Sequence, residues 1–196
     1  IHMKIKHISI FLTFLFCLYL LSLPLLAEDA QNTVGAADID GILASCGADN
    51  VQSFLNGTLT DTAGEGAEFW VIALRQRYSG LDFTAYTNAL KAYIADKAET
   101  FTNPVSRERI ALALAACGYT DLPFVQETAD TCIGELGIMS EIFGLHLLQN
   151  GIVSEKYTTD ALIDELCGRQ HTDGSFSVTG SNGDTDVTAM AVAALA

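Results

Sequence analysis

A short pattern recurs along this chain of 196 residues and restricts the folds that the chain can adopt. The pattern is a small residue, then a large apolar residue, then a glycine six residues further on. It occurs at Ala73, Leu74 and Gly80, at Ala111, Leu112 and Gly118, and at Gly144, Leu145 and Gly151. Further along, Ala189 and Met190 take the first two places. Periods of about 33 to 45 residues are typical of stacked helical hairpins, each unable to bury its apolar face alone.

Apolar residues recur with helical spacing from Asp38 onward, and no segment alternates as a half-buried strand would. The glycines that end the pattern and Pro104, which marks a helix start, separate the helices. The expected helices are 38–47, 50–57, 67–80, 82–99, 106–118, 123–137, 140–151, 158–168 and 186–196. Four of them (67–80, 106–118, 140–151 and 186–196) are nearly apolar all round, which predicts a buried inner layer under a more polar outer one. The small residue of the pattern would let a neighbouring helix approach closely.

The first 27 residues have the features of a secretory signal peptide. Lys4 and Lys6 precede a long apolar run, and the small residue Ala27 stands before Glu28. The run is also long enough for an uncleaved membrane anchor, which is the alternative. The sequence thus predicts a signal peptide at 1–27, a linker at 28–37 and a helical-repeat domain at 38–196, in a secreted or cell-surface protein.

Charge and cysteine content exclude several kinds of partner. The formal net charge of −14 leaves no electrostatic basis for binding nucleic acid or an anionic membrane surface. Four cysteines lie beyond the signal peptide, namely Cys46, Cys117, Cys132 and Cys167. Their even number permits two disulfides, but each lies in or beside an apolar helix, where a free cysteine acts as a small hydrophobe. Because there is no CxxC or HxxxH spacing, we expect no metal site and no cofactor.

The stretch from Gln170 to Phe176, QHTDGSF, resembles the Gln-x-x-Asp-Gly-Ser-aromatic repeat of the terpenoid-cyclase and protein-prenyltransferase superfamily. The segment 64–76 is similar to the start of an inner helix in secreted bacterial proteins with prenyltransferase and squalene-oxidase-type repeats. The resemblance implies an α/α toroid, and its extent implies a partial ring, truncated at the C-terminus. It also implies that Gln170 bonds a neighbouring helix end, that Phe176 stacks across it, and that Asp173 and Gly174 form the turn.

The stretch that follows resembles the acidic motif of the cyclases in that superfamily. Asp184, Asp186 and Thr188 match the motif, whereas Val187 replaces its last aspartate. The resemblance would make Asp186 a proton donor and Asp184 its neighbour. The simpler interpretation is that Asp184 caps the last helix and Asp186 lies in its first turn, where carboxylates suit the helix dipole. The prenyltransferase zinc has no matching histidine, and we expect His146 to be a core histidine.

One set of residues could bind a ligand. Trp70, Glu108, Glu141 and Asp186 each lie four residues before the large apolar residue of the pattern. In parallel inner helices they would gather at one mouth, where Arg107 or Arg109 could join them around a polar ligand or a cation. The alternative is a set of independent first-turn acids.

These observations favour a non-catalytic module that binds a small molecule, a glycan or a protein, and that self-associates through its apolar last helix. The alternative is a class II terpene cyclase that uses Asp186.

Overall fold

The computed structural model describes residues 39–98 and 100–196. The expected signal peptide and linker lie outside these residues. All regular elements in the described part are helices, which confirms the all-α class. None of these helices combines the length and the apolar character needed to cross a membrane. The chain divides between Thr100 and Phe101 into two compact units, which are described separately.

The unit before Phe101 is built around a π-helix. Residues 39–45 are helical. The elements that follow are α3 (Val51–Phe54), the π-helix η1 (Leu55–Leu59), α4 (Glu68–Arg77) and α5 (Thr84–Lys97). Asn50 caps α3, since its Oδ1 accepts a hydrogen bond of 2.9 Å from the Ser53 amide. η1 contacts α3, α4 and α5, and its Leu55 and Leu59 are buried. The core of this unit therefore forms on η1. The helix expected from the sequence, 50–57, ends two residues before η1 does.

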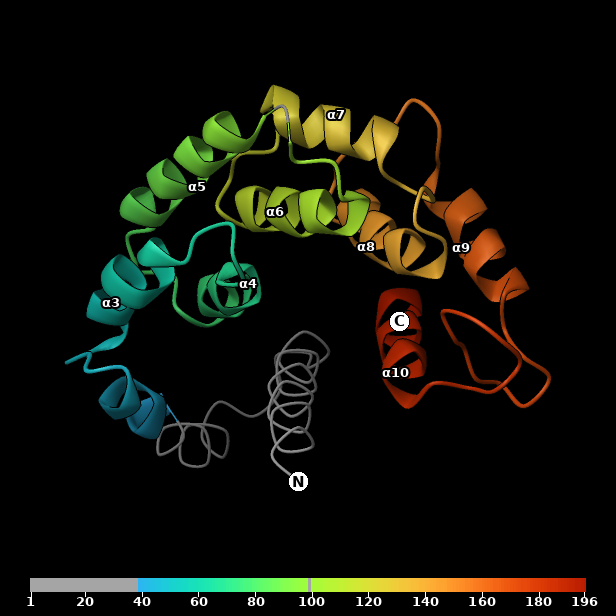
Figure 1. The fold of residues 1–196 in the computed structure, drawn as a ribbon, viewed down its shortest axis with the longest axis horizontal. Helices are drawn as coiled ribbons and strands as arrows, with labels where there is room; N and C mark the ends of the chain where they lie inside the picture. Colours follow the sequence, from blue (N-terminus) through green and yellow to red (C-terminus); the bar gives the residue numbers. More distant parts are fainter. Residues whose placement is uncertain (1–38, 99) are drawn as a thin grey trace. The chain divides into compact units, whose positions relative to one another are not determined.

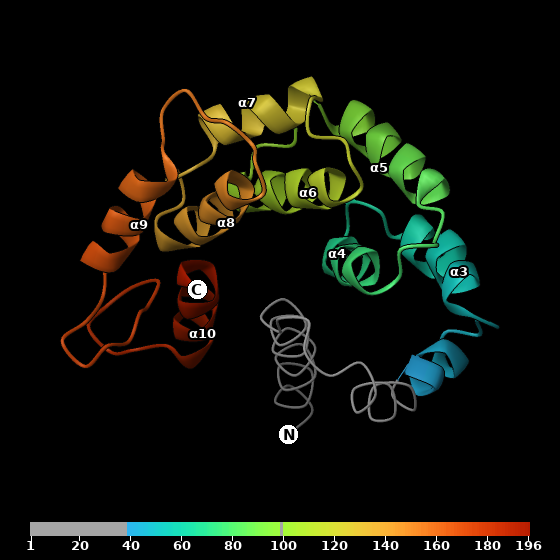
Figure 2. The same ribbon diagram turned by 180° about the vertical axis from the view of Figure 1, so that it is seen from behind.

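The unit from Phe101 onward has two layers. Its helices are α6 (Pro104–Ala116), α7 (Pro123–Thr131), α8 (Ile138–Gln149), α9 (Thr159–Gly168) and α10 (Thr185–Leu195). α8 packs between α6 and α10, whereas α7 packs on α6 and α8, and α9 packs on α8. Figures 1 and 2 show α7 and α9 on one side of the layer formed by α6, α8 and α10. Within this unit the expected alternation of inner and outer helices is present.

Glycine and proline set the helix ends as expected in this unit. Asn103 caps α6 at the Ser106 amide with Pro104 in the first helical position. Gly118 and Gly151 follow α6 and α8 with φ angles of +89° and +83°, a region that favours glycine. One boundary was wrong. The expected helix 123–137 ends at Thr131, because Gly134, with a φ of +80°, lies in the turns that lead to α8.

The first three small residues of the repeated pattern, Ala73, Ala111 and Gly144, lie in the core. Ala73 and Ala111 are buried, and Ala111 is fully so. A Cβ on Gly144 would lie 2.7 Å from Cγ1 of Ile133, a distance that real Cβ contacts essentially never show. The close neighbour of Gly144 is thus the turn after α7. On α10 the large residue Met190 is buried, whereas the small residue Ala189 is only half-buried.

Candidate functional site

The N-terminus of α10 has the local structure that the simpler interpretation predicts. Oδ1 of Asp184 accepts hydrogen bonds from the amides of Asp186, at 2.9 Å, and Val187, at 3.2 Å. Asp184 is therefore the N-cap, and this prediction is confirmed. Asp186 lies in the first turn and is exposed. Partial desolvation, and then the charge of Asp184, raise the pKa of the Asp186 carboxyl above its usual value.

The role expected for Gln170 needs a correction. Its Nε2 donates to the carbonyl oxygen of Gly174 at 2.9 Å, so it closes its own loop instead of bonding a neighbouring helix. The reason is local: the chain turns back at once, and the His171 amide donates to the Ser175 carbonyl at 2.9 Å. Asp173 and Gly174 do form the expected turn. Oδ1 of Asp173 accepts from the Ser175 amide at 3.0 Å, and Gly174 has a φ of +87°.

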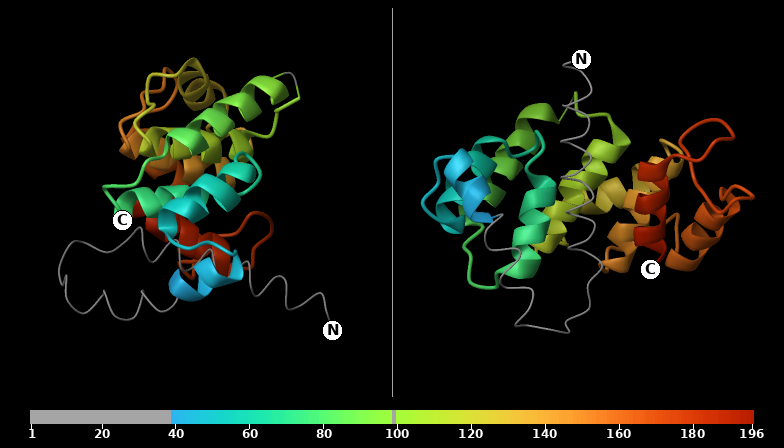
Figure 3. Two further views of the ribbon diagram at one scale, coloured as in Figure 1. Left: turned by 90° about the vertical axis from the view of Figure 1, so that its left-hand side faces the viewer. Right: turned by 90° about the horizontal axis from the view of Figure 1, so that it is seen from below.

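Phe176 joins this loop to α10. Its ring is buried, and its amide donates to Oγ1 of Thr188 at 2.9 Å. Its carbonyl oxygen accepts from the Asp184 amide at 2.8 Å. Backbone hydrogen bonds therefore fix the loop together with the buried ring of Phe176. Figure 3 shows the loop, in red, extending to one side of α10.

Glu108 is the most unusual of the predicted site residues. It lies on α6, is fully buried, and neither of its carboxyl oxygens has a hydrogen-bond partner in the described part of the chain. Burial raises the pKa of this carboxyl from 4.5 to about 9, since a charge would be poorly solvated there. The side chain is therefore a neutral acid at pH 7. It can offer one hydrogen-bond donor and additional acceptor capacity.

Glu141 occupies the corresponding place on α8 but has a partner. It is fully buried, and Arg169, the C-cap of α9, donates to both of its oxygens through Nε and Nη2. This bidentate pair gives each oxygen of Glu141 a hydrogen-bond donor. Sequence reasoning missed Arg169. The signal that could have indicated it is that Arg169 is a single basic residue at the end of α9, a helix that otherwise carries acidic residues.

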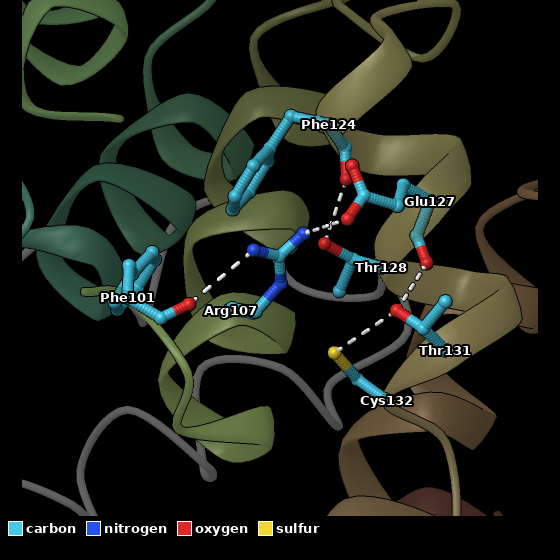
Figure 4. A network of polar contacts seen from close by, with 7 residues as sticks. All are labelled: Phe101, Arg107, Phe124, Glu127, Thr128, Thr131 and Cys132. Carbon is cyan, nitrogen blue, oxygen red and sulfur yellow. Dashed lines mark hydrogen bonds and ion pairs between the residues drawn. The ribbon is translucent and has the colours of Figure 1, made fainter. Parts of the chain in front are cut away.

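Arg107, which was expected beside the acids, lies instead against α7 (Figure 4). Its Nη2 donates to Oε1 of Glu127 at 3.1 Å, and its Nη1 donates to the Phe101 carbonyl at 3.3 Å. Its guanidinium also lies 4.7 Å from the ring centroid of Phe124, a cation–π contact. Arg107 thus ties α7 and the start of this unit to α6. Arg109, on the same helix, is half-buried.

Trp70 belongs to the other unit, on α4, where its ring meets that of Phe54 edge-on at 6.0 Å between centroids. The same helix carries Glu68, a fully buried acid that sequence reasoning missed. Oε1 of Glu68 accepts from the Gly64 amide at 2.7 Å. The signal that could have found it is the one that found Glu108, an acid at the start of a nearly apolar helix.

The predicted acids thus differ in environment. Glu108 is buried without a hydrogen bond, Glu141 is buried and paired, and Asp186 is exposed. Among the described residues, no three His, Cys, Asp or Glu side chains are placed to hold a metal ion together. The four cysteines of the described residues, Cys46, Cys117, Cys132 and Cys167, form no disulfide with one another. His146 is half-buried on α8, and burial lowers its pKa.

Comparison of this chain with protein-family models, with curated proteins and with solved structures finds no match.

Proposed function

We propose that this protein is a secreted or cell-surface module of the α/α-toroid kind that binds a ligand or a protein partner without catalysis. The alternation of a buried helix layer with an outer one, in the unit from Phe101 onward, supports a hairpin-repeat origin. Such scaffolds host many unrelated activities, so the function has to be argued from individual side chains.

The observation that carries this proposal is the unpartnered carboxyl of Glu108. Leaving a buried polar group without a hydrogen bond costs about 1–3 kcal/mol, and such groups are rare in folded proteins. A bound ligand that donates to and accepts from this carboxyl would remove the cost. Because the carboxyl is neutral at pH 7, the ligand that suits it is neutral and polar, such as a glycan hydroxyl or an amide.

The cyclase alternative has less support from the same residues. A proton donor to an alkene needs a water-excluded site, whereas Asp186 is exposed. Its neighbour Asp184 already accepts two backbone hydrogen bonds as the helix cap. The whole chain also has one tryptophan, although a carbocation pathway would need several aromatic faces.

A paired experiment tests the proposal. Isotope-labelled full chain is titrated with neutral disaccharides and with acetamide, and backbone NMR shifts are recorded. We expect the ligand to shift the NMR signals of residues around Glu108 in the unmodified protein. These shifts should be absent in Glu108→Leu. They should persist in Glu165→Gln, which replaces an exposed acid on α9. In parallel, the chain is incubated with squalene and with geranylgeranyl diphosphate. A cyclised product that disappears in Asp186→Asn would overturn the proposal, as would the absence of any response at Glu108 to these probes.

A further inference from the structure

Three asparagines in the described residues stand directly before glycine: Asn56, Asn150 and Asn182. Such a pair can deamidate without an enzyme, because the backbone nitrogen of the glycine can attack the side-chain carbonyl carbon of the asparagine. Glycine has no Cβ to hinder that approach, and it permits unusual backbone angles. Asparagine is for this reason a chemically labile residue. The reaction requires that both the asparagine side chain and the following amide are free to move.

Asn56 does not meet this requirement. It lies within η1, and its Oδ1 accepts a hydrogen bond from Nε2 of Gln52 at 2.9 Å. The following Gly57 belongs to the same π-helix, so the helical backbone holds its amide away from the side chain.

Asn150 does not meet it either. It is the C-cap of α8, and its Nδ2 donates to the His146 carbonyl at 2.8 Å. The Gly151 amide donates to the Leu148 carbonyl at 3.1 Å. Both reacting groups are therefore held by the end of the helix.

Asn182 differs from both. It lies in the loop between α9 and α10, and both it and Gly183 are exposed. Within the described part of the chain, neither its side chain nor the Gly183 amide makes a hydrogen bond. Exposed loops of this kind sample many backbone conformations. We propose that Asn182 is a site of spontaneous deamidation, and that its conversion loosens the start of α10.

The chemistry needs water and no other reagent. The Gly183 nitrogen forms a bond to Cγ of Asn182 and loses its proton, while the side-chain nitrogen leaves as ammonia. The product is a cyclic imide. Water then adds to one of its two carbonyl carbons and breaks one C–N bond, which yields either aspartate or isoaspartate at position 182. Both products carry a new negative charge, and isoaspartate also adds a methylene group to the backbone.

The added backbone length would act next to the hydrogen bonds that hold the start of α10. Gly183 lies close to the Ser175 side chain, since a Cβ on Gly183 would be 2.2 Å from Oγ of Ser175. The next residue, Asp184, donates its amide to the Phe176 carbonyl at 2.8 Å and caps α10 with its carboxylate. Isoaspartate before Gly183 would shift Asp184 relative to Phe176 and weaken the cap.

The experiment ages the full chain in mildly alkaline buffer at body temperature and follows each asparagine by peptide mass spectrometry. We expect Asn182 to convert, with isoaspartate among the products, while Asn56 and Asn150 remain intact when half of Asn182 has reacted. In the aged protein, the amides of Asp186 and Val187 should exchange hydrogen faster than in fresh protein. Asn182→Gln keeps a side-chain amide but disfavours closure of the cyclic imide. In this variant, hydrogen exchange at Asp186 and Val187 should not change on ageing.

Two results would overturn the proposal. Conversion of Asn56 or Asn150 before Asn182 would show that the loop does not select the site. Unchanged hydrogen exchange at Asp186 and Val187 in protein fully converted at position 182 would show that the modification does not reach α10.

Discussion

Arg169 binds Glu141 with two parallel hydrogen bonds that join the end of α9 to the first turn of α8. Glu141 is fully buried, whereas the Arg169 side chain is 44% exposed, so the cation reaches in from the surface to the buried carboxylate. The pair links an outer helix to an inner one across 28 residues of sequence. Each oxygen of Glu141 thereby accepts a charge-assisted hydrogen bond from the guanidinium.

Arg169→Met should destabilise the protein by about 1–3 kcal/mol, because a buried carboxylate loses its donors. The free energy of unfolding in urea measures the effect. Lys156→Met, which removes an exposed cation, is the control and should have little effect. The double variant Arg169→Met/Glu141→Met should recover part of the loss, because apolar residues can replace a buried ion pair. Equal stability of Arg169→Met and the unmodified protein would contradict the structural role of the pair.

Glu108 should make the protein less stable as the pH rises. Its pKa in the folded protein is about 9, above the value of 4.5 for an ordinary glutamate carboxyl. The contribution of Glu108 to stability is therefore fully present below pH 4.5 and is lost as the pH rises through about 9. At pH 7 the loss is on the order of 3 kcal/mol. Glu108→Gln stays neutral and should therefore be the more stable form at pH 8, with a difference that vanishes near pH 4. Denaturation at several pH values measures this, and an identical pH dependence in both proteins would refute it.

Two glycine substitutions should have opposite effects. Gly144→Ala would place a Cβ 2.7 Å from Ile133, and the strain should cost about 1–3 kcal/mol despite the higher helix propensity of alanine. Gly168→Ala, at the end of α9, meets nothing within 4 Å and should stabilise by up to about 1 kcal/mol. Chemical denaturation of both variants tests the pair. A stabilising Gly144→Ala would show that Ile133 moves aside freely.

The two aspartates at the start of α10 should differ in their contribution to stability. Asp184→Ala removes the cap and should cost about 0.5–2 kcal/mol. Asp184→Asn should retain most of the stability, because an amide oxygen also accepts from the helix amides. Asp186→Asn should change it little, since that side chain is exposed. Thermal unfolding of the three variants provides the measurement, and a larger loss at Asp186 than at Asp184 would reverse the assignment.

Export is the prediction that concerns the residues before the described part. The protein released by a secreting host should begin near Glu28, as N-terminal sequencing of the culture supernatant would show. The variant Lys4→Glu/Lys6→Glu removes the positive start of the signal peptide and should reduce release. Full-length protein that stays in the cytoplasm would contradict the prediction.

The sequence by itself determined several of the helix ends, because those signals are local. Asn103 and Pro104, the N-cap and first residue of α6, start that helix. Gly118, with a positive φ, follows its end, and Asp184 is the N-cap of α10. Each of these effects needs only the residue and its neighbours within one turn of helix. The same reasoning failed at Thr131, where the apolar pattern continues although turns replace the helix. Hydrophobic spacing alone does not distinguish a buried turn from a buried helix.

Only the tertiary structure decided which of the repeated acids has a hydrogen-bond partner. Glu108 and Glu141 hold equivalent places in the repeated pattern, and both are fully buried. Glu141 is paired with Arg169, whereas Glu108 has no hydrogen-bond partner and burial raises its pKa to about 9. The difference arises because the packing of α9 on α8 brings one arginine to one of the two acids. The charge of a buried carboxyl depends on which distant side chain reaches it, and no local pattern contains that information.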